Sequence, residues 1–439
     1  MMKTTDGAPL RFFNPGLYQS DEDVISQFCV RESELGFILD ILCRNIESPS
    51  CRHVLVAAPH GMGKSMLLAR TAAELRGNAA LSARLLPARF MDECHDIADF
   101  AGFCLETMSL LAGELAASDA ELAEELRTAV DRMSAEGAEA SLRNEAVDML
   151  CQTADRTGKR LVLLVEELEE ICLGAGEEFS RRLGEVLLSE PRIMLVATAT
   201  GRLEPSGEDR QTLAGMFALQ TLKPLTAGEC RALWRSLDGA GADRDIRPLE
   251  ILTEGNPRLL AMFAAASRRG QPWSLLEEAA ALVDWNTDYF RERLAALPKS
   301  ERRVFAATLD LWQASTTGEI AVRARMDVRA VSTMLRRLID RGAVAHETPA
   351  GGGRKRYAAA EPLHCIWRRL LRGGAAAKEV SRLLRFMEEF YGAGEAQGMR
   401  FSSETWETGL AYMEAERAPR EVLAVAEDIR QRQGGKAAL

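Results

Sequence analysis

The fold of this 439-residue chain is decided by the stretch His53-Val-Leu-Val-Ala-Ala58-Pro59-His60-Gly61-Met62-Gly63-Lys64-Ser65-Met66. Val54 to Ala57 is a short apolar run typical of a buried strand, and Met66 to Leu75 has the pattern of a helix. A strand that ends in a glycine-rich loop before a helix directs backbone N–H groups toward the positive end of the helix dipole, where an anion is favoured. The stretch therefore predicts a strand–loop–helix unit with a phosphate site in its loop.

The loop resembles the nucleotide-binding P-loop pattern G-x-x-x-x-G-K-[ST], with Ala58 in place of the first glycine. In this motif Lys64 reaches the β- and γ-phosphates, and the Ser65 hydroxyl binds Mg²⁺. A Cβ at Ala58 costs little if its φ is negative. The alternative is a degenerate or purely structural loop. The residues expected to surround the nucleotide are Ala58, Pro59, His60, Gly61, Met62, Gly63, Lys64, Ser65 and Met66.

A second signal is Arg160-Leu-Val-Leu-Leu-Val165-Glu166-Glu167, an apolar run that predicts a buried parallel strand with two carboxylates at its end. Ligands of open α/β sheets bind beyond the carboxyl ends of the strands. The run resembles a Walker B motif, with Glu166 on the metal side and Glu167 orienting the attacking water. Because Glu166 stands where this motif has Asp, slow hydrolysis, or binding with little turnover, stays open. The alternative is the acidic first turn of a helix.

A third segment, Phe28-Cys-Val30-Arg31-Glu-Ser-Glu34-Leu35, lies upstream of the loop. It resembles the F-x-G-R-E-x-E-L segment of AAA+-type ATPases of the origin-initiator group and of the STAND group, the signal-transduction ATPases with numerous domains. In those families the segment lies against the adenine, so the resemblance implies that Arg31 contacts the nucleotide. Val30 departs from the usual glycine. The resemblance also implies that the ligands are ATP and Mg²⁺.

The resemblance extends to two sensor residues. The apolar run from Arg192 ends in Thr198-Ala-Thr200, and a polar residue at this place is sensor 1 in these families. We take Thr198 first and Thr200 second, although threonine is also simply a good strand residue. Gly-Asn-Pro-Arg258 resembles the lid motif, which makes Arg258 sensor 2. The alternative is a helix start, capped by Asn256, with a solvent-facing arginine.

Other arginines compete for the role of an arginine aimed at nucleotide. Arg202 follows the sensor strand, and the rivals are Arg181, Arg182 and Arg192. Further predicted elements are a strand at 83–90, a helix at 91–115 and one helix over 273–295.

Three short helices and a hairpin are predicted between residues 300 and 357, with Ser300, Thr316/Thr317 and Asp327 as N-caps. This order predicts a winged helix-turn-helix. Its third helix would present arginines to a DNA major groove, and its basic hairpin tip would contact phosphates. A solvated helix face, or a protein-binding or autoinhibitory module, are the alternatives. The candidate DNA contacts are Arg329, Arg336, Arg337, Arg354, Lys355 and Arg356.

Composition limits the partners. The net charge of −10 argues against a protein that coats nucleic acid, but residues 299–372 hold 15 Lys/Arg and 7 Asp/Glu. No apolar run approaches the ~20 residues of a membrane helix. Nine cysteines without a C-x-x-C pair indicate reduced thiols and a cytoplasmic protein.

The predicted fold is an α/β P-loop core with a parallel sheet (1–225), an α-helical lid (226–297), a winged helix-turn-helix (298–373) and a helical tail (374–439). We expect an ATP-driven switch in which lid closure moves the winged helix, with Glu167 orienting water for hydrolysis. Double-stranded DNA is the expected partner of the winged helix, and a nucleotide-dependent oligomer is a further expectation. The alternatives are a signalling ATPase whose winged helix and tail bind protein, and a non-hydrolysing nucleotide-binding scaffold.

Overall fold

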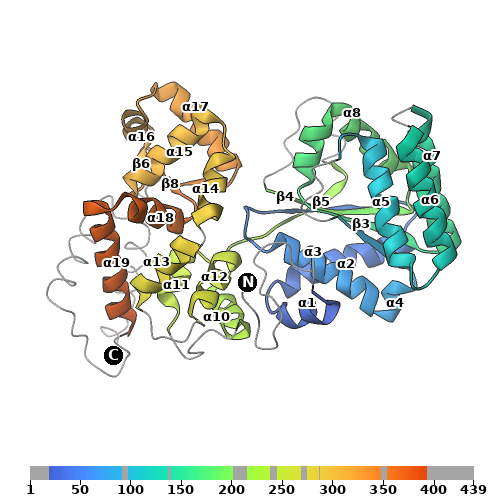
Figure 1. Ribbon diagram of the computed structural model, residues 1–439, viewed down its shortest axis with the longest axis horizontal. Helices are drawn as coiled ribbons and strands as arrows, with labels where there is room; N and C mark the ends of the chain where they lie inside the picture. The colour runs from blue at the N-terminus through green and yellow to red at the C-terminus, as the bar shows by residue number, and fades with distance from the viewer. Residues whose placement is uncertain are drawn as a thin grey trace. The chain divides into compact units, whose positions relative to one another are not determined.

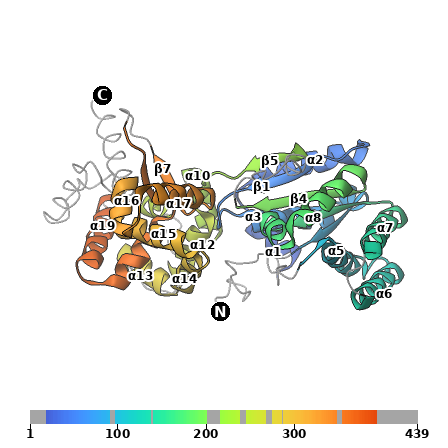
Figure 2. The same cartoon turned by 90° about the horizontal axis from the view of Figure 1, so that it is seen from above.

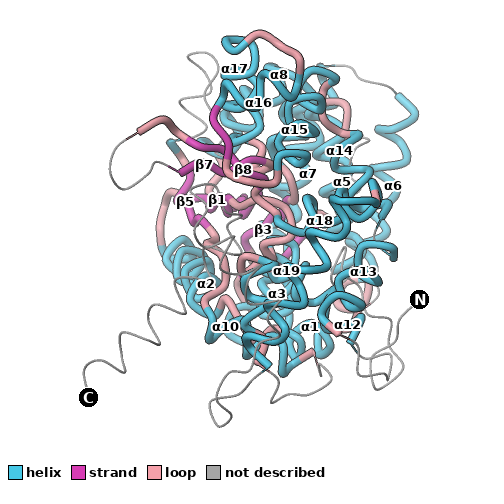
Figure 3. The backbone as a smooth tube through the Cα atoms, turned by 90° about the vertical axis from the view of Figure 1, so that its left-hand side faces the viewer, coloured by secondary structure: helices cyan, strands magenta, loops and turns pink. Residues whose placement is uncertain are grey.

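The computed structural model describes residues 19–90, 97–136, 140–200, 215–237, 245–267, 274–285, 287–347 and 353–392. The chain divides into two units, Met1–Lys223 and Pro224–Leu439, each described by itself (Figure 1). Helices make up most of the trace, and the strands form two separate sheets (Figure 3). Within the described ranges, every helix is too short or too polar to cross a membrane.

The first unit is built on a parallel five-stranded sheet of order β2-β3-β4-β1-β5. β1 (His53–Ala57) pairs with β4 (Ile193–Ala199) on one side and with β5 (Phe217–Thr221) on the other. β3 (Arg160–Val165) pairs with β4, and β2 (Leu85–Arg89) forms the edge beside β3. Both strands predicted from the P-loop and Walker B stretches are therefore present, with β4 between them.

Helices cover both faces of this sheet. They are α1 (Asp21–Gln27), α2 (Glu32–Glu47), α3 (Lys64–Gly77), α4 (Ala79–Ser82), α5 (Phe100–Leu115), α6 (Ala120–Glu136), α7 (Ala140–Thr157) and α8 (Leu168–Ser189). Side chains alternate along β3, so that Leu161 and Leu163 pack under α5–α8 while Val162 and Leu164 pack under α2 and α3. α6 and α7 both lie against α5 (Figure 1, Figure 2). A parallel sheet buried on both faces explains why its strands are continuously apolar.

The second unit begins with five helices. They are α10 (Ala227–Ser236), α11 (Arg247–Thr253), α12 (Pro257–Ser267), α13 (Leu275–Trp285) and α14 (Thr287–Ala295). Thr226 and Glu229 form a capping box at the start of α10. Asn256 accepts the N–H groups of Arg258 and Leu259 at 3.0 and 3.3 Å, which confirms it as the cap of α12.

The rest of this unit combines helices with a three-stranded antiparallel sheet of order β6-β8-β7. Thr316 caps α16 and Asp327 caps α17, as predicted. Val331, Leu335 and Leu338 of α17 are buried. The elements are α15 (Lys299–Leu311), β6 (Ser315–Thr316), α16 (Thr317–Ala324), α17 (Val328–Asp340), β7 (Val344–Glu347), β8 (Arg356–Ala359), α18 (Pro362–Arg372) and α19 (Gly374–Gly392).

Several predicted element bounds were wrong. The helix expected from 91 begins at Phe100, because the Asp99 side chain caps it by accepting the Gly102 N–H at 2.8 Å. Pro298, not Ser300, is the N-cap of α15. The single helix expected over 273–295 is two helices, α13 and α14. Within the predicted tail, α19 is described, and residues 393–439 lie outside the described residues.

Candidate active site

The predicted chemical residues gather at the carboxyl edge of the first sheet. Val56 of β1 lies opposite Thr198 of β4, and Val165 of β3 lies opposite Ala197. The Ala58 N–H continues the pairing by donating to the Ala199 carbonyl at 3.1 Å. Because the three strands run parallel in this register, the P-loop, Thr198 and the two glutamates reach the same edge, where ligands of such sheets bind.

The P-loop has the backbone that its glycines allow. Gly61 and Gly63 have φ values of 80° and 92°, in the region that favours glycine, and α3 starts directly after them at Lys64. Ala58 is not among the described residues with positive φ, so its Cβ is accommodated without strain. The Lys64 ammonium donates to the carbonyls of Ala58 and Pro59 at 2.7 and 3.4 Å. A buried cation is thus held directly over the loop.

Glu166 lies beside the P-loop serine. The Ser65 hydroxyl donates to Oε2 of Glu166, although the two residues are 101 positions apart in the sequence. Its other oxygen, Oε1, is 3.2 Å from the Arg89 guanidinium. A hydroxyl and a carboxylate side by side are oxygen ligands of the kind that Mg²⁺ prefers, usually completed by substrate phosphates and water. The donor set of Ser65 and Glu166 therefore fits Mg²⁺.

Glu167 has a left-handed backbone, with φ 48° and ψ 48°, immediately before α8. Its N–H donates to the Thr198 hydroxyl at 2.9 Å, and its carboxylate lies 3.2 Å from Nδ1 of His60. The carboxylate therefore leaves the β3 strand toward the P-loop rather than along the helix. This geometry brings together three residues predicted from separate motifs.

The two candidate sensor threonines have different partners. Thr198 is fully buried and contacts the Glu167 backbone. The Thr200 hydroxyl instead donates to Glu169 at 2.6 Å. Burial raises the pKa of the Glu169 carboxyl, and the two hydrogen bonds from Thr200 oppose that shift. Thr198 is thus the threonine in contact with Glu167, and Thr200 is linked to the first turn of α8.

Arg31 is buried and tied to protein atoms. Its guanidinium donates to the carbonyls of Lys223 and Met62 at 2.5 and 3.4 Å and pairs with Glu34 at 3.2 Å. Arg31 itself adopts the left-handed region, with φ 75°, at the start of α2. Its printed contacts hold the upstream segment against the P-loop and the last residue of this unit.

The remaining candidate arginines are distributed differently. Arg258 belongs to the second unit, where its guanidinium lies over the Tyr289 ring at 5.9 Å. Arg181 pairs with Glu178 and Glu185 along α8. Arg192 pairs with Asp155 at 2.7 Å and with Glu190 at 2.5 Å. Arg202 lies outside the described residues.

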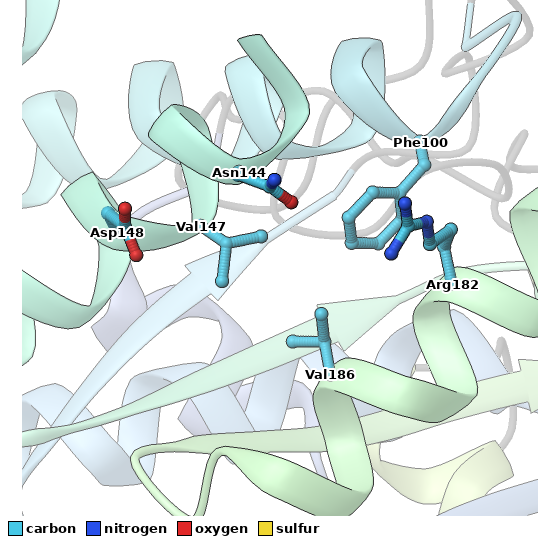
Figure 4. Close-up of a pocket in the computed structure, with 6 residues that line it drawn as sticks. All are labelled: Phe100, Asn144, Val147, Asp148, Arg182 and Val186. Atoms are coloured by element: carbon cyan, nitrogen blue, oxygen red, sulfur yellow. The ribbon is translucent and has the colours of Figure 1, made fainter. Parts of the chain in front are cut away.

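Arg182 lines a pocket of about 160 Å³ between α5, α7 and α8. Figure 4 shows Arg182 and Phe100 on one side of it and Asp148 on the other. The lining residues are Phe100, Asn144, Val147, Asp148, Arg182 and Val186. None of the P-loop or Walker B residues is among them, so this pocket is separate from the candidate active site.

The predicted DNA contacts lie on α17 and β8. Arg329, Arg336 and Arg337 are exposed on α17, but Arg337 also lies 3.6 Å from the buried Glu301 of α15. The remaining predicted contacts are on the hairpin: Arg354 and Lys355 are exposed before β8, and Arg356 is half-buried at its start.

Arg89 is the residue that sequence reasoning missed. It ends the apolar strand Leu85–Arg89, and its side chain is 8% exposed. A charged residue at the carboxyl end of a buried parallel strand was the signal that identified Glu166 and Glu167. The same signal was present at Arg89, but which strand would lie beside β3 was unknown.

Comparisons with known proteins agree with this geometry. Residues 27–225 match a protein-family model described as the AAA ATPase domain. No curated protein matches the chain in sequence. The fold is similar to that of the Walker-type ATPase paby2304 of Pyrococcus abyssi, with 15% identity and a TM-score of 0.56 over 82% of this chain and 100% of that chain.

Two further solved structures are similar at lower TM-scores. The Orc1 protein of Aeropyrum pernix, in complex with DNA, is 16% identical over 79% of this chain and 96% of that one, with a TM-score of 0.46. The RuvB Holliday junction branch migration motor of Thermotoga maritima is 13% identical over 80% and 96%, with a TM-score of 0.36. The sequence match and the fold together support an ATPase, with its AAA ATPase domain at residues 27–225.

Proposed function

We propose that this chain is an ATP-hydrolysing switch in which the state of the nucleotide site sets the position of a DNA-binding winged helix. The observation that carries the hydrolytic part is the convergence of Lys64, Ser65, Glu166, Glu167 and Thr198 at one sheet edge. These residue types in this arrangement supply a phosphate-binding cation, metal ligands and a carboxylate that orients water.

The P-loop N–H groups and Lys64 bind the phosphates in this proposal. Ser65 and Glu166 would hold Mg²⁺, which neutralises charge on the phosphates when it is bound. Glu167 orients the attacking water, and Thr198 fixes the backbone from which that carboxylate extends. His60 contacts the Glu167 carboxylate from the P-loop side, so the state of the loop acts on the water-orienting residue.

The lid is proposed to be residues 226–297, with Arg258 as its nucleotide sensor. Gly255 has φ +68°, and a Cβ there would meet the Leu225 carbonyl oxygen at 2.5 Å. The Leu225 N–H in turn donates to the Gly255 carbonyl at 2.9 Å. Glycine is therefore required where the entry to the second unit crosses the turn that positions Arg258.

A chain of contacts connects Arg258 to the C-terminal helices. Arg258 lies over the Tyr289 ring, and the Tyr289 hydroxyl accepts from Arg293 at 2.9 Å. Arg293 also pairs with Glu361, the N-cap of α18. Because Glu361 is buried beside Arg293, its pKa lies below its usual range despite the opposing effect of burial. Movement of Arg258 would thus be passed to α18 through a buried ionic group.

Residues 298–373 are proposed to be a winged helix-turn-helix that binds double-stranded DNA. Three helices and a β-hairpin follow in the order of that fold, and the segment carries an excess of eight positive charges on an acidic protein. The exposed α17 arginines and the basic residues before β8 are on elements that would read a groove and contact phosphates. Basic residues outside a binding face would not make affinity depend on salt.

Two experiments test the proposal separately. Lys64→Ala should abolish ATP binding measured with a fluorescent analogue, and retention of wild-type affinity would contradict the nucleotide site. Replacing Arg354, Lys355 and Arg356 by Ala should weaken duplex DNA binding in a gel shift and reduce its salt dependence. If wild-type protein binds no DNA at any salt concentration, a signalling ATPase whose winged helix and tail bind protein becomes the better account.

The second candidate is a non-hydrolysing nucleotide-binding scaffold. It is favoured by Glu166 at a place where the resembled motif has Asp, and by the engagement of both Glu166 oxygens with protein groups. Measurable turnover that Glu167→Gln abolishes would exclude it.

A further inference from the structure

Arg89 occupies an unusual place for an arginine. It ends β2, in register with Leu164 of β3, and its side chain is 8% exposed. Its guanidinium lies 3.2 Å from Oε1 of Glu166, whose side chain is 3% exposed. The strands thus bring a fixed positive charge to the carboxylate that the proposed function places on the metal side.

The Glu166 carboxylate is engaged on both oxygens. Ser65 donates to Oε2 while Arg89 contacts Oε1, so the carboxylate lies between the P-loop hydroxyl and a guanidinium. Breaking a buried pair by removing one partner leaves an uncompensated charge. Arg89 keeps its charge in proteins, since its ordinary pKa is far above neutrality. The pair is therefore neutral as a unit, at the edge where phosphates are proposed to bind.

Other charged groups around Arg89 balance one another. Arg76 and Asp21 both act electrostatically on Arg89, in opposite directions, and they pair with each other at 2.7 Å. Glu114 also pairs with Arg76, at 2.8 Å. Glu166 is thus the carboxylate in direct ionic contact with Arg89 among the printed pairs, and Arg89 governs its charge balance.

We propose that Arg89 is a positioning residue that neutralises Glu166 and so makes ATP binding at this site only weakly dependent on Mg²⁺. The inference rests on the proposed nucleotide site. With Arg89 present, the Glu166 carboxylate adds no net charge near the triphosphate. Without Arg89, the carboxylate would repel the phosphates unless a divalent cation lay between them.

The test compares ATP affinity in EDTA with ATP affinity in Mg²⁺, using a fluorescent ATP analogue. We expect the gain from Mg²⁺ to be at least about tenfold larger in Arg89→Met than in wild type, chiefly because Arg89→Met binds poorly in EDTA. Arg89→Lys, which keeps the charge, should restore most of the EDTA affinity. Arg84→Met is the matched control, because Arg84 lies before the same strand and is exposed. It should leave the ratio unchanged.

A second variant keeps the test decisive if Arg89→Met does not fold. Glu166→Gln removes the carboxylate charge and leaves Arg89 as a net cation, so ATP should bind more tightly in EDTA than it binds to wild type. An unchanged ratio in Arg89→Met, or weaker EDTA binding in Glu166→Gln, would overturn the inference while leaving the nucleotide site intact. If wild-type protein binds no ATP in either buffer, the proposed function fails and this inference fails with it.

Discussion

Replacing Thr198 by Val should uncouple the backbone of Glu167 from the sheet. The Thr198 hydroxyl accepts the Glu167 N–H at 2.9 Å, and Thr198 is completely buried. Valine has nearly the same shape but cannot accept this hydrogen bond. The Glu167 amide then loses its partner while Glu167 still has to keep its left-handed φ of 48°.

The size of the effect follows from that geometry. Leaving a buried N–H without a partner costs about 1–3 kcal/mol, and a left-handed backbone costs a non-glycine residue roughly 1–2 kcal/mol. We expect Thr198→Val to lose about 2 kcal/mol of stability. Glu167 should also relax out of its position, and turnover should fall by about tenfold or more, because tenfold corresponds to about 1.4 kcal/mol.

The assay is ATP turnover together with thermal unfolding, for Thr198→Val and Thr198→Ser. Serine keeps the hydroxyl and loses one methyl group, worth about 1 kcal/mol of burial. Thr198→Ser should therefore retain most of the turnover. If valine keeps wild-type turnover while serine loses it, the methyl group and not the hydrogen bond is what matters, and the reasoning is refuted.

Three further predictions concern stability and DNA binding. His53 is buried, and burial lowers its pKa to about 4, so the unfolded chain binds an extra proton between about pH 4 and 6.5 and stability falls on acidification; His53→Gln should flatten this slope by up to about 1.4 kcal/mol per pH unit, and thermal unfolding against pH measures it. Asp310 is 7% exposed and receives three arginine side chains, so Asp310→Ala should lower the stability of the full chain by about 2 kcal/mol, with an unchanged urea midpoint contradicting this. Arg336→Ala should weaken DNA binding without changing the melting temperature, whereas Glu301→Gln should lower that temperature, because Glu301 is buried against Arg337 and Arg341; the opposite pattern would remove α17 as the reading helix.

Local features of the fold could be predicted from the sequence. Asp327 and Asn256 were correctly predicted as N-caps because a cap and the N–H groups it accepts lie within three residues. The same rule failed at Ser300, since Pro298 has a fixed φ and begins the helix first. It also failed at the start of α5, where Asp99 was overlooked as a cap.

The candidate site was predictable only in part. Lys64, Ser65 and the two glutamates follow from strand ends, since a buried parallel strand presents its next residue at the ligand edge. The contact between Arg89 and Glu166 joins residues 77 positions apart, so it required the strand order β2-β3-β4-β1-β5. The left-handed backbone of Glu167 had no signal in the sequence, because glutamate rarely adopts it.

The role of Arg31 also differed from the expectation. The resemblance placed it against the nucleotide, whereas its printed contacts are with Lys223, Met62 and Glu34. A long side chain that reaches a carbonyl 192 positions away cannot be assigned from local pattern. Nucleotide contact by the Arg31 segment therefore remains a prediction, which the affinity of Arg31→Ala for ATP would test.

The central claim is that Glu167, held by Thr198 beside the P-loop, makes this chain a hydrolysing ATPase coupled to DNA. The most direct measurement is steady-state ATP turnover by wild type, Glu167→Gln and Lys64→Ala, each with and without duplex DNA. We predict that wild type hydrolyses ATP at a rate that DNA changes, that Glu167→Gln binds ATP without turnover, and that Lys64→Ala does neither. Wild-type turnover that both substitutions leave unchanged, or ATP binding without turnover in every variant, would contradict the account.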